Sequence, residues 1–368
     1  MIFRVPSYYK DFQCIAGACE HSCCIGWEVD IDEETSSYYK SVKGAFGKRL
    51  AEHMVSEDVD RFALKENGWC PFLNEQKLCD ICIELGEEAL SEVCTEYPRF
   101  TMEYEQVREK ILSISCEEVG RILFSSQQKE EWQEWSLPEE MEQEEQEESA
   151  GISAKRLEEV RARAVELLQD RTRPVFVRAV DYLEYCTKMQ RDLFGGRLKE
   201  DVGEKAIKGN DTDWQAYADF QKRIECLEAL EVLDENWTKT LQEMCRIFRE
   251  DNYNKMQREF MGAVREREYE YEHLLVYFTF RYFMRAYYDG NILTKAQLAV
   301  FCVLSIRDMD VARYFANGKK FDLQDRIDTA RIYSREVEHS EENLELLAED
   351  FLFEEVCQPA AMIRQLVQ

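Results

Sequence analysis

The spacing of hydrophobic residues divides the chain into two parts of different character. In the C-terminal part, apolar residues recur every three or four positions, as at Leu157, Val160 and Ala164, which is typical of an amphipathic helix. In the N-terminal part the pattern is short and irregular. Over residues 27–32 apolar and acidic residues alternate, a period of two that predicts a half-buried strand.

The helical pattern of the C-terminal part continues with few interruptions. Ser153 is a suitable N-cap for its first helix, Pro174 can begin the next helix, and Gly195 and Gly196 can end it. Because no strand-like alternation of any length follows, we predict an all-α domain built as an antiparallel bundle or array. Its further helices are expected over residues 214–233, 236–248, 268–288, 294–306, 323–337 and 340–353.

The N-terminal part predicts several short elements. Asp32 can cap a helix that covers Tyr38 and Tyr39, and Ser115 can cap one that covers Val119 and Leu123. The residues between these caps are expected to form a hairpin over 68–79, short helices over 83–85 and 87–93, and two extended runs over 100–104 and 107–114.

The two parts are separated by a strongly acidic stretch. Residues 125–151 contain ten glutamates and one lysine, and such a run repels itself and is normally a solvated linker. We therefore predict a cysteine-rich domain over residues 1–125, an acidic linker over 126–151 and a helical domain over 152–368. The predicted fold class is mainly α, with a small irregular α+β domain at the N-terminus.

Composition and charge narrow the range of partners. The chain has 368 residues, with 47 basic and 75 acidic side chains and a formal net charge of −28. A chain this acidic repels phosphate, so we expect neither nucleic acid nor a membrane as its partner. No apolar run has the length of a membrane span, and the N-terminal residues lack the pattern of a secretion signal. We therefore expect a cytoplasmic protein with reduced thiols.

Cysteines carry the clearest chemical signal. Nine of the fourteen lie in the first 116 residues, and the first block places Cys14, Cys19, Cys23 and Cys24 within eleven residues. Thiolates prefer soft or borderline ions, which indicates zinc or an iron–sulfur cluster. Adjacent side chains in extended backbone point to opposite faces. Either Cys23 and Cys24 serve different ligand sets, or the loop bends sharply between them.

The remaining cysteines are less specific. Cys79 and Cys82 form a CxxC pair, but with Cys70, Cys94 and Cys116 they lack the layout of a zinc ribbon. Buried structural thiols are the alternative, while disulfides are disfavoured by the expected compartment. The thiols within the helical pattern are expected to be small buried hydrophobic residues; they are Cys186, Cys226, Cys245, Cys302 and Cys357.

These blocks resemble a known family. FQCIAGACEHSCCIGWEVDID, CPFLNEQKLCDI, LSEVCTEYPRF and LSISCEEVGRIL are similar, in order and spacing, to the cysteine blocks of the flagellin lysine-N-methylase family. The N-terminal part of that family is similar to a wider group of zinc- or iron-chelating cysteine domains. The resemblance covers about the first 125 residues, and HLLVYFTFRYFMRAYYDG extends it more loosely toward the C-terminus.

The resemblance implies a function and a set of ligands. It implies methyl transfer from S-adenosylmethionine to lysine side chains of flagellin, with a cysteine-ligated iron–sulfur centre, 4Fe–4S before zinc. Arg99, in a family-like aromatic, proline and arginine run, is a candidate for binding a cofactor carboxylate; a surface salt bridge is the alternative. Eight thiols could form two four-ligand centres or one cluster with extra thiols nearby, and Cys82 falls outside the pattern. The implied ligands are Cys14, Cys19, Cys23, Cys24, Cys70, Cys79, Cys94 and Cys116.

The residues themselves limit the mechanism. The chain has no glycine-rich loop of the Rossmann type, and Cys24 follows Cys23 where a radical CxxxCxxC motif would continue to residue 26. Direct polar methyl transfer is therefore favoured. The aromatic stripe over residues 269–288 is more typical of a core than of a substrate channel. The alternative function is a non-catalytic metalloprotein, in which the cysteine cluster is structural and the helices bind a protein partner.

Overall fold

The computed structural model describes residues 1–27, 29–56, 59–137, 149–195 and 213–367, and it is mainly helical with two small sheets. The described chain divides into two compact units. The unit that we call the cysteine unit consists of residues Asp11–Phe100 and Leu112–Val119. The other, which we call the helical unit, consists of Met1–Lys10, Thr101–Ile111 and Gly120–Gln368.

The helical unit contains a four-stranded sheet in the order β5-β6-β1-β7. In it β1 (Ile2–Pro6) runs parallel to β6 (Val107–Leu112) and antiparallel to β7 (Trp132–Ser136), and β5 (Arg99–Tyr104) completes the sheet. The sequence analysis assigned residues 132–136 to the acidic linker, but they form the strand β7. Trp135 packs its ring against Phe3, which explains the strand in an otherwise polar stretch. The glutamate-rich residues 138–148 lie outside the described part.

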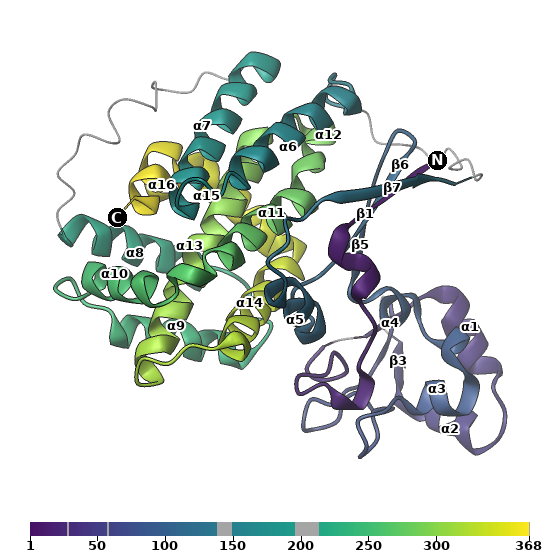
Figure 1. The fold of residues 1–368 in the computed structure, drawn as a ribbon. Helices are drawn as coiled ribbons and strands as arrows, with labels where there is room; N and C mark the ends of the chain where they lie inside the picture. The colour runs from purple at the N-terminus through teal and green to yellow at the C-terminus, as the bar shows by residue number, and fades with distance from the viewer. Residues whose placement is uncertain (28, 57–58, 138–148, 196–212, 368) are drawn as a thin grey trace. The chain divides into compact units, whose positions relative to one another are not determined.

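Helices make up the rest of this unit (Figure 1). Most of α13 is buried, and it contacts α7, α11, α14, α15 and α16, so it forms the centre of the helical packing. The bounds are α5 (Glu117–Ser125), α6 (Ala154–Leu168), α7 (Val175–Phe194), α8 (Asp213–Glu228), α9 (Glu235–Ile247), α10 (Tyr253–Ala263), α11 (Tyr269–Tyr282), α12 (Ala286–Asp289), α13 (Ile292–Ala316), α14 (Leu323–Glu338), α15 (Glu341–Phe353) and α16 (Pro359–Leu366).

Local signals explain where several of these helices begin and end. The Ser153 hydroxyl accepts a hydrogen bond from the Arg156 backbone N–H, which caps α6, and Pro174 precedes α7. Gly195 ends α7 with a left-handed backbone (φ 67°), a conformation that glycine adopts at little cost. These predictions are confirmed. Two helices were not predicted: α10 lies between two predicted segments, and α16 lies beyond the last of them.

The interior of the helical unit contains buried ion pairs. The Arg326 guanidinium is fully buried and contacts the carboxylates of Asp310 and Glu270. Arg178 similarly reaches buried Glu272, with 2.5 Å between Nη1 and Oε2. Such charges tolerate burial because each has a partner of opposite sign.

The cysteine unit is built from short elements around a small core. Its three-stranded sheet has the order β2-β4-β3, in which both pairings are antiparallel. Asp32 caps the first helix by accepting the Thr35 backbone N–H at 2.8 Å, as predicted. The elements are β2 (Asp30–Ile31), β3 (Met54–Ser56), β4 (Asp60–Phe62), α1 (Glu33–Ser41), α2 (Gly44–His53), α3 (Asp80–Leu85) and α4 (Glu92–Glu96).

Two further expectations about the helical part can be compared with the structure. The aromatic stripe lies on α11, where every residue from Glu270 to Tyr282 is buried, so it belongs to the core as the spacing favoured. Of the five C-terminal cysteines, all but Cys245 are buried. The prediction for Cys245 was wrong because it lies on the solvent side of α9. None of the described helices combines the length and the apolar character of a membrane span.

Candidate metal centre

The first cysteine block lies on a loop that turns at the adjacent pair. Residues Cys23 and Cys24 form the turn, and their two thiols share a hydrogen bond. The Ser22 hydroxyl accepts the backbone N–H of Cys24 at 3.2 Å and supports the turn. Cys23 and Cys24 therefore lie on a sharp bend, and each of them faces different thiols.

Cys23 faces a first set of thiols. Its pKa is raised by the hydrogen bond with Cys24, by burial and by the nearby thiols of Cys116 and Cys14. The pKa of Cys19 is raised by burial, by Glu117 and then by Cys116. Because electrostatic influence falls with distance, these thiols lie near one another. We call Cys14, Cys19, Cys23 and Cys116 the first thiol set.

A carboxylate holds the first thiol set together. Glu117 accepts the backbone N–H of Glu20 at 2.8 Å and that of His21 at 2.9 Å. These bonds tie the loop after Cys19 to the residue after Cys116. Although Glu117 directly follows a cysteine in the sequence, nothing in the local pattern indicated that it bridges two distant blocks.

Cys24 belongs with a second group of thiols. The Cys70 backbone N–H donates to the Cys24 carbonyl at 2.8 Å, and Leu73 and Cys79 pair as an antiparallel bridge, which brings the predicted hairpin back on itself. Cys94 and Cys79 both affect the pKa of Cys70. All four thiols pack in one apolar cluster with Tyr39, Phe62 and Phe72. We call Cys24, Cys70, Cys79 and Cys94 the second thiol set.

The electrostatic surroundings keep most of these thiols protonated. Burial, followed by Glu117 and Cys116, raises the pKa of Cys19 to about 12. Burial, together with neighbouring thiols, raises the pKa of Cys70 to about 12 and that of Cys94 to about 11. In the coupled pair, the hydrogen bond from Cys23 lowers the pKa of Cys24 to about 7. Thiols that raise each other's pKa release protons readily only when a cation arrives, so this donor set suits a thiophilic metal.

The thiols of each set lie near one another, but they do not surround a common position that a metal ion could occupy. Among the described residues, no group of three or more His, Cys, Asp or Glu side chains has the spacing that would hold a metal ion. The predicted ligand set therefore stays a prediction. The chemistry of the donors fits a cysteine-ligated centre, whereas the positions of the sulfurs do not yet have the geometry of one.

Two residues from the sequence analysis lie beside these sets. The Arg99 guanidinium lies 5.6 Å from the centre of the Phe12 ring and donates to the Thr95 carbonyl at 3.4 Å. Its predicted role toward a cofactor carboxylate stays a prediction. Cys82, which the family pattern leaves out, shares a hydrogen bond with the thiol of Cys79 and borders the second thiol set.

Tyr97 is a residue that the sequence analysis did not single out for a role at the first thiol set. Its hydroxyl lies 3.1 Å from the Ser115 hydroxyl. Burial, followed by Cys116 and Cys23, raises the pKa of Tyr97 well above its ordinary value. A neutral phenol therefore lies beside these thiols.

Comparison with known proteins identifies the family. The FliB lysine N-methylase C-terminal domain family matches residues 161–365, more than half of the chain. The protein therefore belongs to the FliB lysine N-methylase family. The match covers the helices from α7 to α16 almost completely.

Individual relatives agree with this assignment. The chain is 32% identical over 132 residues to the flagellar biosynthetic protein FliU of Salmonella muenchen, a match that covers 32% of this chain and 75% of that protein. It is 31% identical over 132 residues to the lysine-N-methylases of Salmonella choleraesuis and Salmonella typhimurium. These matches cover 32% of this chain but only 31% of each methylase. No solved structure matches the chain.

Proposed function

We propose that the protein is an S-adenosylmethionine-dependent protein-lysine N-methyltransferase that acts on flagellin or a similar surface protein. The observation that carries this proposal is membership of the FliB lysine N-methylase family over residues 161–365. The names of the relatives in Salmonella, a flagellar biosynthetic protein and two lysine-N-methylases, support the choice of substrate. We further propose that the protein works in the cytoplasm.

The proposed cofactor is an iron–sulfur cluster, 4Fe–4S before zinc, held by cysteines of the cysteine unit. Two groups of four thiols support it, and they would hold either two four-ligand centres or one cluster with extra thiols nearby. When bound, such a centre would supply positive charge to the thiolates and either position the methyl donor or brace the domain. Arg99, which follows Cys94 closely in the sequence, is proposed to bind a carboxylate of the donor.

Methyl transfer sets demands that the protein itself must meet. The lysine amine has to be neutral to attack the methyl group, so the site must remove its proton and hold amine and methyl in line. The net charge of −28 favours encounter with a lysine-bearing protein. The proposed reaction is direct polar transfer to the amine.

Incubation of the anaerobically purified protein with flagellin and labelled methyl donor tests the activity. Methyl-lysine on flagellin is the expected product, found by mass spectrometry of its peptides. If metal-replete protein yields none, the chain is better described as a non-catalytic metalloprotein.

Metal analysis of matched cysteine variants tests the cofactor. We expect iron and sulfide in the purified protein, and we expect less of both in Cys94→Ser, which removes a member of the second thiol set. The control is Cys245→Ser, which removes an exposed thiol of the helical unit and should leave metal content unchanged. If the purified protein contains stoichiometric zinc and no iron, the centre is a zinc site and not an iron–sulfur cluster.

A further inference from the structure

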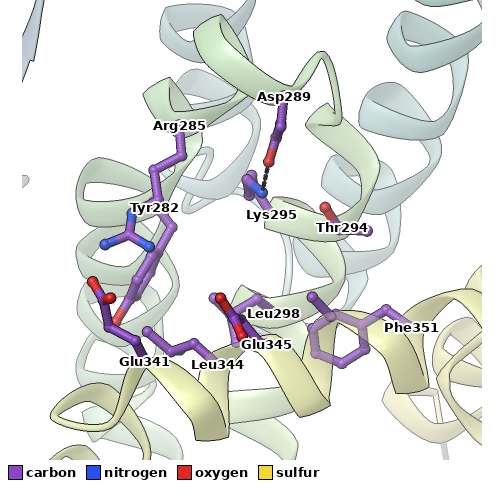
Figure 2. A pocket seen from close by; sticks show the side chains of 11 residues that line it. Tyr282, Arg285, Asp289, Thr294, Lys295, Leu298, Glu341, Leu344, Glu345 and Phe351 are labelled. Carbon is purple, nitrogen blue, oxygen red and sulfur yellow. Dashed lines mark hydrogen bonds and ion pairs between the residues drawn. The ribbon is translucent and has the colours of Figure 1, made fainter. Parts of the chain in front are cut away.

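A small cavity lies in the helical unit. Its walls come from the end of α11, from α12, from the start of α13 and from α15 (Figure 2), and its volume is about 270 Å³. Ligand pockets commonly measure about 300–1,000 Å³, so this cavity suits one side chain better than a whole nucleotide cofactor. Leu298, Leu344 and Phe351 give it apolar walls.

The charges in the cavity leave two carboxylates available. The Lys295 ammonium forms an ion pair with Asp289, so these two charges offset each other. Glu341 and Glu345 stand one turn apart on α15 and are exposed, and neither forms an ion pair within the described chain. Arg285 extends toward Glu341 at one end, whereas Glu345 projects into the middle of the cavity (Figure 2). The Glu345 carboxylate is therefore available to bind a cationic ligand.

Tyr282 forms the aromatic wall of the cavity, and hydrogen bonds of its hydroxyl hold the ring in place. The Tyr282 hydroxyl donates to Glu338 Oε2 at 3.0 Å and accepts from Arg281 Nε at 2.7 Å. The Arg285 guanidinium lies 5.5 Å from the centre of the Tyr282 ring on the cavity side. A wall fixed by its own hydrogen bonds does not have to be ordered when a ligand arrives, which lowers the cost of binding.

We propose that this cavity binds a lysine side chain of the protein substrate. The ammonium would lie at Glu345, with Glu341 next to it, and the methylenes would pack on Leu298, Leu344 and Phe351. A lysine fits this pattern because it combines a four-carbon apolar stem with a compact cation at its end. This inference rests on the proposed function, since it is a lysine methylase that needs a site for lysine.

Binding of a lysine analogue to the full-length protein without methyl donor tests the proposal directly. The probe is Nα-acetyl-lysine N-methylamide, titrated by saturation-transfer-difference NMR, a method suited to weak ligands. We expect transfer to the side-chain methylenes. In Glu345→Gln the dissociation constant should rise roughly fivefold to tenfold, because a partly exposed charged contact is lost.

Three comparisons keep the test specific. Glu349→Gln removes the same charge one turn further along α15 from an exposed residue that does not line the cavity, and it should bind as the parent does. Ala348→Leu keeps every charge but fills the cavity, and it should weaken binding. The Nε-acetylated probe, which lacks the cation, should not bind. Equal binding of this neutral probe, or equal effects of the two glutamine variants, would overturn the proposal.

The outcome is separable from the proposed function. If the protein methylates flagellin but Glu345→Gln binds lysine as well as the parent does, the cavity is not the lysine site, and the proposed activity still stands. Lysine binding that depends on Glu345, in a protein that methylates nothing, would keep the cavity and remove the activity.

Discussion

The two units of the molecule stabilise their polar interiors in different ways. In the helical unit, each buried cation described above has a carboxylate against it, as with Arg326 between Asp310 and Glu270. In the cysteine unit, the thiols of the two sets, of which only Cys70 is fully buried, face other thiols, and burial raises the pKa of Cys116 to about 11. The helical unit thus contains the partners of its own charges, while the thiols of each set face like groups that raise one another's pKa.

This difference indicates which unit depends on something outside the chain. Ion pairs between side chains form as soon as the helices pack. A thiol set gains its stabilising interactions only when a metal replaces its protons, and metal binding is then coupled to folding. We therefore expect the cysteine unit to need its metal and the helical unit to be indifferent to it.

Removal of the metal should have the largest effect, and only on the cysteine unit. Structural zinc contributes about 10–16 kcal/mol to small zinc-dependent folds, far more than the short helices and the sheet β2-β4-β3 can replace. After chelation, hydrogen exchange followed by mass spectrometry should show loss of protection in residues 59–100. Peptides from α13 serve as the internal control. Equal protection of both regions before and after chelation would contradict the comparison.

Removal of one buried carboxylate should affect the helical unit strongly. Asp310→Ala leaves the buried Arg326 with Glu270 alone and takes an acceptor from the hydroxyls of Tyr271 and Thr329. The free energy of unfolding should fall by about 3–5 kcal/mol. Urea unfolding followed by circular dichroism at 222 nm measures it.

The matched control for this variant is an exposed pair. Glu243→Ala breaks the ion pair with Arg246 on the surface of α9, where the change should stay below about 1 kcal/mol. A small effect of Asp310→Ala would mean that the buried pairs are not what closes this unit.

The sequence predicted the helical unit better than the cysteine unit, for a physical reason. Helix caps and apolar periodicity are local, so Ser153, Pro174 and Gly195 were sufficient to place α6 and α7. Within the helical unit, the strand β7 was missed because its stability comes from pairing with β1, a contact between distant segments. A single short strand has no clear signal of its own in the sequence, because its stability depends on the strands it pairs with.

The candidate site was predictable in its chemistry but not in its grouping. Cysteine spacing and the family resemblance pointed to the eight thiols, and Cys23 and Cys24 were expected to divide between ligand sets or to sit on a bend. Which partners each would face depends on long-range contacts, such as the bridge from Glu117 to the loop after Cys19. The cavity beside α15 was not foreseen, because Glu341 and Glu345 resemble any solvated helix face in the sequence.

A change of pH gives the smallest and most local test of the comparison. Burial, with Arg281 and Arg335 nearby, lowers the pKa of His339 from 6.5 to about 3. Below pH 6.5 the unfolded chain binds a proton there that the folded chain does not, so stability falls as the pH drops. The loss is at most about 1.4 kcal/mol for each pH unit.

The variant His339→Gln isolates this effect. Its stability relative to the parent, measured by urea unfolding of the helical signal, should rise by about 2 kcal/mol between pH 7 and pH 5, since glutamine has no proton to gain. The other titrating groups, including Glu336 with its pKa raised by burial to about 7, are common to both proteins and cancel in the difference. A difference that stays constant with pH would mean that the ring gains its proton at the same pH in the folded and in the unfolded protein. In that case the helical unit would accept the charge of this ring at no cost to its stability, and the contrast with the thiol sets would be weaker than the ion pairs suggest.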